Sequence, residues 1–147
     1  MTLKNILLGV VAIFITIQFF QIDKSTSPVD PTKDFIVLTQ PDEELTKILQ
    51  TACYDCHSNQ TVYPWYSYIS PVNWWLKHHV EEGTEHLNFS NWADYSAKKA
   101  DHKLEEMYEE VEEGEMPLNS YTWAHGDARL TTEQREKLIS WVQSLRK

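Results

Sequence analysis

Two cysteines and a histidine lie within one five-residue segment, Cys53-Tyr54-Asp55-Cys56-His57, and the chain has no other cysteine. Two thiols separated by two residues match the spacing of the two vinyl groups of haem, to which thiols can add. The histidine that follows can then reach the iron from the same side. The segment therefore predicts one covalently attached haem c, bound through Cys53 and Cys56, with His57 as the proximal iron ligand.

Two other chemistries use closely spaced cysteines and remain as alternatives. A structural zinc site needs four ligands, usually from two cysteine pairs, and this chain has a single pair. A dithiol redox pair of the thioredoxin type expects a strand–helix–strand context, of which the sequence gives no sign. Two cysteines so close together cannot build a disulfide framework. Haem attachment is the favoured interpretation.

The iron of such a haem needs a second axial ligand, which is usually Met or His in electron-transfer cytochromes. Met116 precedes Pro117, which restrains a loop by fixing φ, and we expect Met116 to be the distal ligand. Met107 lies on an apolar helical stripe and is expected to fill the core. The alternatives are a histidine, His125 first and then His79, or an open position.

Apolar residues recur at helical spacing in four segments beyond residue 40, and only four glycines interrupt the chain. No alternation typical of strands is visible. We therefore expect an all-α haem domain of about four helices. The expected helices run from near Pro41 into Cys53, from Ser70-Pro71 to Gly83, from after Ser90 to Gly114, and from Thr131 or Thr132 to Leu145.

The N-terminal residues 3–22 are mostly apolar and carry one charge, Lys4. Twenty helical residues cover about 30 Å, enough to span a bilayer core, so residues 1–22 are expected to form a transmembrane anchor. A cleaved signal peptide is the alternative, although cleavage would fall before Pro28. Residues 23–40 are expected to be a linker and residues 41–147 the haem domain. The flanking charges predict a cytoplasmic N-terminus with the remainder outside.

The formal net charge of −9 argues against nucleic-acid binding, which needs a basic face, and favours a partner with a basic patch. An acidic run at residues 105–115 could dock such a partner, but we favour a solvated helix face. An aromatic cluster is expected to pack around haem rather than to stack on bases. The cluster comprises Tyr63, Trp65, Tyr66, Tyr68, Trp74 and Trp75.

Taken together, these motifs resemble known haem proteins. The order of the Cys53–His57 motif, the Met116-Pro117 loop and a C-terminal helix resembles the class I cytochrome c arrangement. More narrowly, several segments resemble the small bacterial haem-binding domain family, over about residues 41–145. These segments are 53–61, 65–66, 86–92 and 116–118. The resemblance implies a small all-α haem domain on an exported protein.

The expected function is one-electron transfer by a membrane-tethered monohaem c-type cytochrome. The resemblance and the apolar N-terminus together predict a single-pass protein of the bacterial inner membrane, with its haem domain in the periplasm. Its partners would be redox proteins, and its N-terminal helix would contact the membrane. The alternative function is a haem sensor or peroxidase-like enzyme with an open or displaceable distal position, in which His125 would act as an acid or base.

Overall fold

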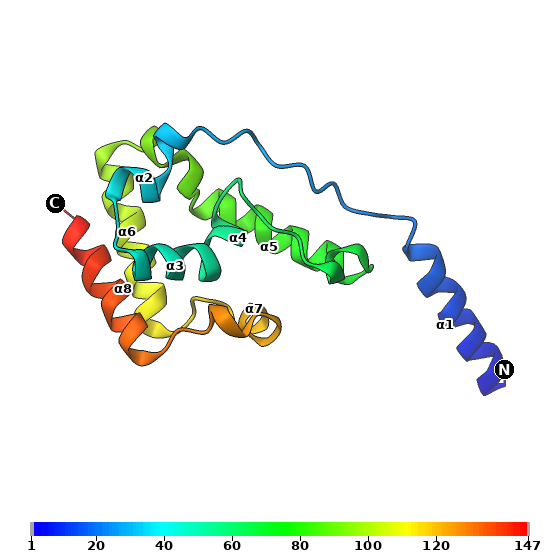
Figure 1. The fold of residues 1–147 in the computed structure, drawn as a ribbon. Coiled ribbons are helices and arrows are strands. Elements are labelled where there is room, and N and C mark those ends of the chain that lie inside the picture. Colours follow the sequence, from blue (N-terminus) through cyan, green and yellow to red (C-terminus); the bar gives the residue numbers. More distant parts are fainter. Residues whose placement is uncertain (1, 147) are drawn as a thin grey trace.

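The computed structural model describes residues 2–146, and within them the chain forms helices and no β-strand (Figure 1). The expectation of an all-α fold is therefore confirmed. The described residues hold more helices than expected, because several are too short to show a periodic pattern in the sequence. The α-helices are α1 (Leu3–Ile17), α2 (Phe35–Thr39), α3 (Glu43–Ala52), α4 (Tyr54–His57), α5 (Val72–His86), α6 (Ala97–Glu113), α7 (Asn119–Ala124) and α8 (Thr132–Leu145). The 3-10 helices are η1 (Pro31–Lys33), η2 (Trp65–Tyr68), η3 (Phe89–Asp94) and η4 (Gly126–Ala128).

Local capping signals set the ends of the longer helices. The Thr131 hydroxyl accepts a hydrogen bond from the Gln134 amide at 3.2 Å, and the Gln134 side chain accepts one from the Thr131 amide at 3.0 Å. This capping box starts α8 where the sequence predicted it. Helix α6 ends at Glu113 and is followed by Gly114, whose φ of 82° suits a residue without Cβ. Helix α3 starts slightly later than expected, with Asp42 as its cap.

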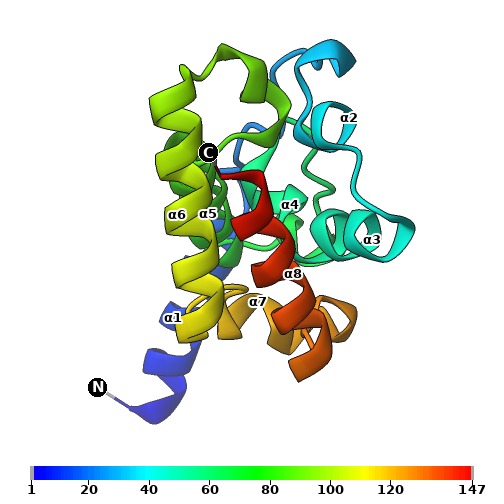
Figure 2. The same ribbon diagram turned by 90° about the vertical axis from the view of Figure 1, so that its left-hand side faces the viewer.

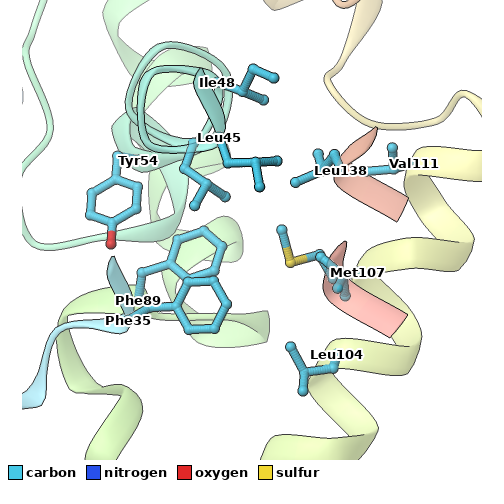
Figure 3. Close-up of a cluster of buried hydrophobic side chains, with 11 residues drawn as sticks. Phe35, Leu45, Ile48, Tyr54, Phe89, Leu104, Met107, Val111 and Leu138 are labelled. Atoms are coloured by element: carbon cyan, nitrogen blue, oxygen red, sulfur yellow. The ribbon is translucent and has the colours of Figure 1, made fainter. Parts of the chain in front are cut away.

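The hydrophobic core lies between α3, α6 and α8, with α2 and η3 covering one end (Figures 2 and 3). Phe35 is fully buried and stacks on Phe89, with 5.0 Å between the ring centroids. The core thus includes a side chain from residues 23–40, the segment expected to be a linker. The core cluster comprises Phe35, Leu45, Ile48, Leu49, Tyr54, Phe89, Leu104, Met107, Val111, Leu138 and Val142.

The predicted transmembrane helix is wrong. Among residues 2–146, no helix combines the length and the apolar character that crossing a membrane requires. Helix α1 ends at Ile17 after 15 residues, which cover about 22 Å of the ~30 Å of a bilayer core. The chain then leaves the helix, and the Gln18 amide group exchanges hydrogen bonds with the backbone of Ser70, at 2.9 Å and 3.0 Å. The predictions of a single-pass inner-membrane location and of membrane contact through this helix are overturned with it.

The residues that were expected to complete the span instead run along the start of α5. The Trp74 indole donates a hydrogen bond to the Phe20 carbonyl at 2.9 Å, and the Lys77 ammonium donates one to the Asp23 carbonyl at 3.2 Å. Figure 1 shows α1 projecting beyond this contact, away from the rest of the chain, and none of its residues is buried.

Candidate functional site

A cavity of about 520 Å³ is lined by residues of α4 and α5 on one side and of α6 and α7 on the other. Its volume is within the range of cofactor pockets, roughly 300–1,000 Å³. Cys53, Cys56, His57 and Met116 all line it. The fold thus brings together four residues that the sequence predicted as one site, although about sixty positions separate Met116 from the other three.

Two backbone carbonyl groups fix the ring of His57 on the side of the cavity formed by α4 and α5. Its Nδ1 lies 2.9 Å from the carbonyl oxygen of Gly83 and 3.2 Å from that of Leu87. Because carbonyl oxygens only accept, Nδ1 carries the proton and Nε2 keeps its lone pair for a metal. Burial lowers the pKa of His57 and so favours the neutral imidazole, which is the form that binds iron.

Gly83 contributes to the site in a way that the sequence analysis missed. We expected helix α5 to stop there, but the helix continues to His86. A Cβ at Gly83 would lie 2.5 Å from the carbonyl oxygen of Cys56, so only glycine lets α5 approach the Cys53–His57 segment this closely. An isolated glycine inside a helical pattern was the available signal.

The two cysteines line the cavity and are not joined by a disulfide. Burial raises the pKa of Cys53 to about 12 and that of Cys56 to about 11, so both thiols stay protonated. Metals and disulfide exchange require the thiolate. Among residues 2–146, no group of three or more His, Cys, Asp or Glu side chains is placed to hold a metal ion. The zinc alternative therefore has no ligand set in the described part of the chain.

The opposite wall carries Met116 on the turn between α6 and α7. The Met116 amide donates to the carbonyl of Glu110 at 3.0 Å, and its carbonyl accepts from the Arg135 guanidinium at 3.3 Å. The same guanidinium nitrogen donates to the carbonyl of Val111. A backbone hydrogen bond to α6 and the Arg135 side chain of α8 therefore fix the backbone of Met116. Arg135 is a second residue that the sequence analysis missed.

Met107 is the other methionine of the described chain that lines the cavity. It also belongs to the core cluster, as expected, and Figure 3 shows it pointing from α6 into that cluster. The cavity is therefore lined by two thioethers, one packed on a helix and one carried by a turn.

The histidine alternatives lie in different places. His125 is not among the residues lining the cavity; it stacks on Tyr121 with 4.2 Å between the ring centroids, and its Nε2 lies 3.4 Å from the Tyr66 hydroxyl. His79 does line the cavity. However, it belongs to α5, the helix whose Gly83 carbonyl accepts the hydrogen bond from His57 of α4, so His79 lies on the same side of the cavity as His57. The geometry thus favours neither histidine as a ligand opposite His57.

None of the six members of the aromatic cluster, which was expected to pack around haem, is among the residues that line the cavity. Trp65 and Tyr68 are 75% and 62% exposed. Trp74 contacts Phe20, and Lys24 lies 3.8 Å from the centroid of the Tyr68 ring. Two of the six, Trp74 and Tyr68, thus contact the N-terminal segment, which periodic patterns in the sequence could not reveal.

The acidic run is divided between two environments. Glu106 and Glu110 line the cavity, and Glu106 pairs with Lys103 at 2.6 Å. Glu105 pairs with Arg146 at 3.0 Å. The remaining members of the run are exposed or half-buried, as on a solvated helix face; they are Glu109, Glu112, Glu113 and Glu115.

Comparison with known proteins gives one match. No curated protein and no solved structure matches the chain. A family model described as the haem-binding domain matches residues 12–144, which is most of the sequence and includes every residue assigned to the cavity above. The chain therefore belongs to the haem-binding domain family, and haem is the cofactor that this membership supports.

Proposed function

We propose that this protein is a monohaem c-type cytochrome that carries single electrons, with an arrangement of the class I type. Thioether bonds from Cys53 and Cys56 would hold the haem, His57 would bind the iron on one side and Met116 on the other. The observation that carries the proposal is that one cavity is lined by all four residues, with Nδ1 of His57 already bound to two carbonyl oxygens.

Haem supplies an iron that accepts and gives up one electron, and the chain's own residues set the conditions for that exchange. The carbonyls of Gly83 and Leu87 keep His57 in one tautomer and orientation. Apolar side chains from α6 and α8, including Val111 and Leu138, exclude water from part of the lining. A Met ligand on the distal side would raise the reduction potential relative to two histidines.

The charge of the chain supports a basic redox partner. The formal net charge is −9. Helix α6 carries exposed glutamates, and it also carries Glu106 and Glu110, which line the cavity. Such a field would accelerate encounter with a positively charged partner and would weaken at high ionic strength. These side chains can form a solvated helix face and still attract a partner, since electrostatic attraction at a distance needs no specific contact.

Covalent attachment is tested by producing the protein together with a cytochrome c maturation system. The mass after denaturation should include one haem, and Cys53→Ala combined with Cys56→Ala should abolish the retained haem. Native mass spectrometry should still detect haem with the double variant if the cavity binds it noncovalently. An intact parent protein without bound haem would contradict the proposal.

The distal ligand is tested with a matched pair of variants, Met116→Leu and Met107→Leu. Both remove a thioether and nearly conserve volume, so the core is little disturbed. We expect Met116→Leu to abolish the Met–iron charge-transfer band of the ferric protein, to lower the reduction potential, and to give a haem that binds cyanide readily. Met107→Leu should leave the spectrum unchanged.

Other spectra would point to specific alternatives. Loss of the band in Met107→Leu alone would transfer the ligand role to Met107. A parent protein with a high-spin spectrum would favour the sensor or peroxidase-like alternative, in which the distal position is open.

A further inference from the structure

The turn from Met116 to Tyr121 forms part of the cavity wall facing α4 and α5, and polar contacts hold it at both ends. Glu110 and Arg135 fix its first residue, as described above. At the other end, the hydroxyl of Tyr121 lies 2.8 Å from Oδ2 of Asp55 and 3.3 Å from the carbonyl oxygen of Thr51. The second end is therefore attached to the opposite side of the cavity.

Asp55 lies between the two cysteines of the haem motif. Its Oδ1 accepts a hydrogen bond from the Val62 amide at 3.0 Å, while Oδ2 accepts the bond from Tyr121. Burial, and then the hydrogen bond to Asp55, raise the pKa of Tyr121, so the phenol remains protonated and able to donate. The carboxylate thus connects the attachment segment to α7 through a bond between a neutral donor and a charged acceptor.

We propose that Tyr121 is a positioning residue for the distal side of the haem. Its hydrogen bond to Asp55 connects α7 to the proposed haem-attachment segment, residues 53–57, and thereby holds the Met116 turn against the cavity. We call this hydrogen bond the latch. The identity of the iron ligand in this inference rests on the proposed function, but the latch itself does not.

The short length and sparse packing of α7 explain why a single hydrogen bond can determine its position. The helix has only six residues, too few to be stable without tertiary contacts. Its Thr122 is buried, but Trp123 is 85% exposed, so the Trp123 side chain adds little packing between α7 and the rest of the chain. Tyr121 supplies both the latch and a ring that stacks on His125. Hydrogen bonds to charged groups are among the stronger ones in proteins.

The test compares Tyr121→Phe with Tyr108→Phe. Both remove only a hydroxyl that bonds to a charged side chain, because the Tyr108 hydroxyl accepts from Arg146 at 3.3 Å. Tyr108 does not line the cavity. In Tyr121→Phe, we expect hydrogen exchange at residues 119–124 to accelerate about tenfold or more, and cyanide to bind the ferric haem faster by a similar factor. Tyr108→Phe should change neither measurement at the cavity.

A double-mutant cycle identifies the partner of Tyr121. In an Asp55→Ala background, Tyr121→Phe should have a much smaller effect on both measurements, because the bond is already lost. Equal effects in the two backgrounds would overturn the assignment of Asp55 as the partner.

The two measurements separate the latch from the proposed function. Unchanged exchange at residues 119–124 in Tyr121→Phe would overturn the latch, whatever the haem spectrum shows. Faster exchange with an unaltered rate of cyanide binding would overturn the link between the latch and the iron. A parent protein without a Met–iron band, combined with faster exchange in Tyr121→Phe, would reject Met116 as the ligand while the latch stands.

Discussion

The two walls of the cavity are built from different kinds of contact. On the attachment side, backbone meets backbone: Gly83 lies against the Cys56 peptide, and two main-chain carbonyls hold the ring of His57. On the opposite side, the turn that carries Met116 has one backbone hydrogen bond, to Glu110, and is otherwise held by two long side chains, Arg135 to the Met116 carbonyl and Tyr121 to Asp55. The difference indicates that His57, the proposed proximal ligand, is fixed by backbone contacts, whereas the turn of Met116, the proposed distal ligand, depends largely on two side-chain contacts.

This contrast has a functional consequence. Displacing a wall held by backbone packing requires moving whole helices, while a wall held by side chains can open when one contact is lost. We therefore expect external ligands to compete for the distal position and not for the position of His57. Point variants on the two walls should differ in the same way.

The largest effect, on the free energy of unfolding, is expected at Met107, which lines the cavity and also belongs to the hydrophobic core. Met107→Ala should destabilise the protein by about 2–5 kcal/mol, because it leaves a void among buried neighbours. Chemical denaturation measures the change, and the haem spectrum of the folded protein should stay unchanged. Val62→Ala is the control, because Val62 is 74% exposed and the truncation leaves no cavity. Equal costs for the two variants would show that Met107 is not packed as described.

Gly83→Ala should have the next largest effect, and it probes the attachment wall. The new Cβ must push α5 away from Cys56, which should cost about 1–3 kcal/mol and lower the yield of covalent haem. Gly126→Ala is the matched control, because a Cβ there meets no atom within 4 Å. If both variants attach haem equally well, the close approach of α5 does not position His57.

Local signals predicted the parts of the structure that depend on neighbouring residues. The Cys53–His57 motif, the cap at Thr131 and the end of α6 at Gly114 follow from short-range chemistry. The apolar stripe of α6 correctly placed Met107 in the core. All of these could be derived from spacing and residue type alone.

Contacts between distant segments were not predictable in this way. Asp55 and Tyr121 are 66 positions apart, and no pattern in the sequence pairs them. Apolar character suggested a membrane span at residues 3–22, but a hydrogen-bonding partner at Ser70 interrupts that segment at Gln18. Predicting the whole site needs both kinds of information, since the residues proposed as ligands belong to short motifs, whereas the walls are formed by contacts between distant segments.

The smallest effect is expected at Thr131, and it tests whether α8 supports the distal turn. The amide of Arg135 donates to the Thr131 carbonyl at 3.0 Å, so the first turn of α8 carries the guanidinium that holds Met116. Thr131→Ala removes the capping box and should cost about 1 kcal/mol. It should also let the first turn fray, which loosens Arg135 and modestly accelerates cyanide binding to the ferric haem.

Ser96→Ala is the control, because Ser96 caps α6 by accepting from the Lys99 amide at 3.3 Å and contacts no residue of the distal turn. Its cost should be similar, but cyanide binding should not change. Identical binding rates in the two variants would show that Arg135 does not transmit the state of α8 to Met116, and the distal turn would then depend on Tyr121 and α6 alone.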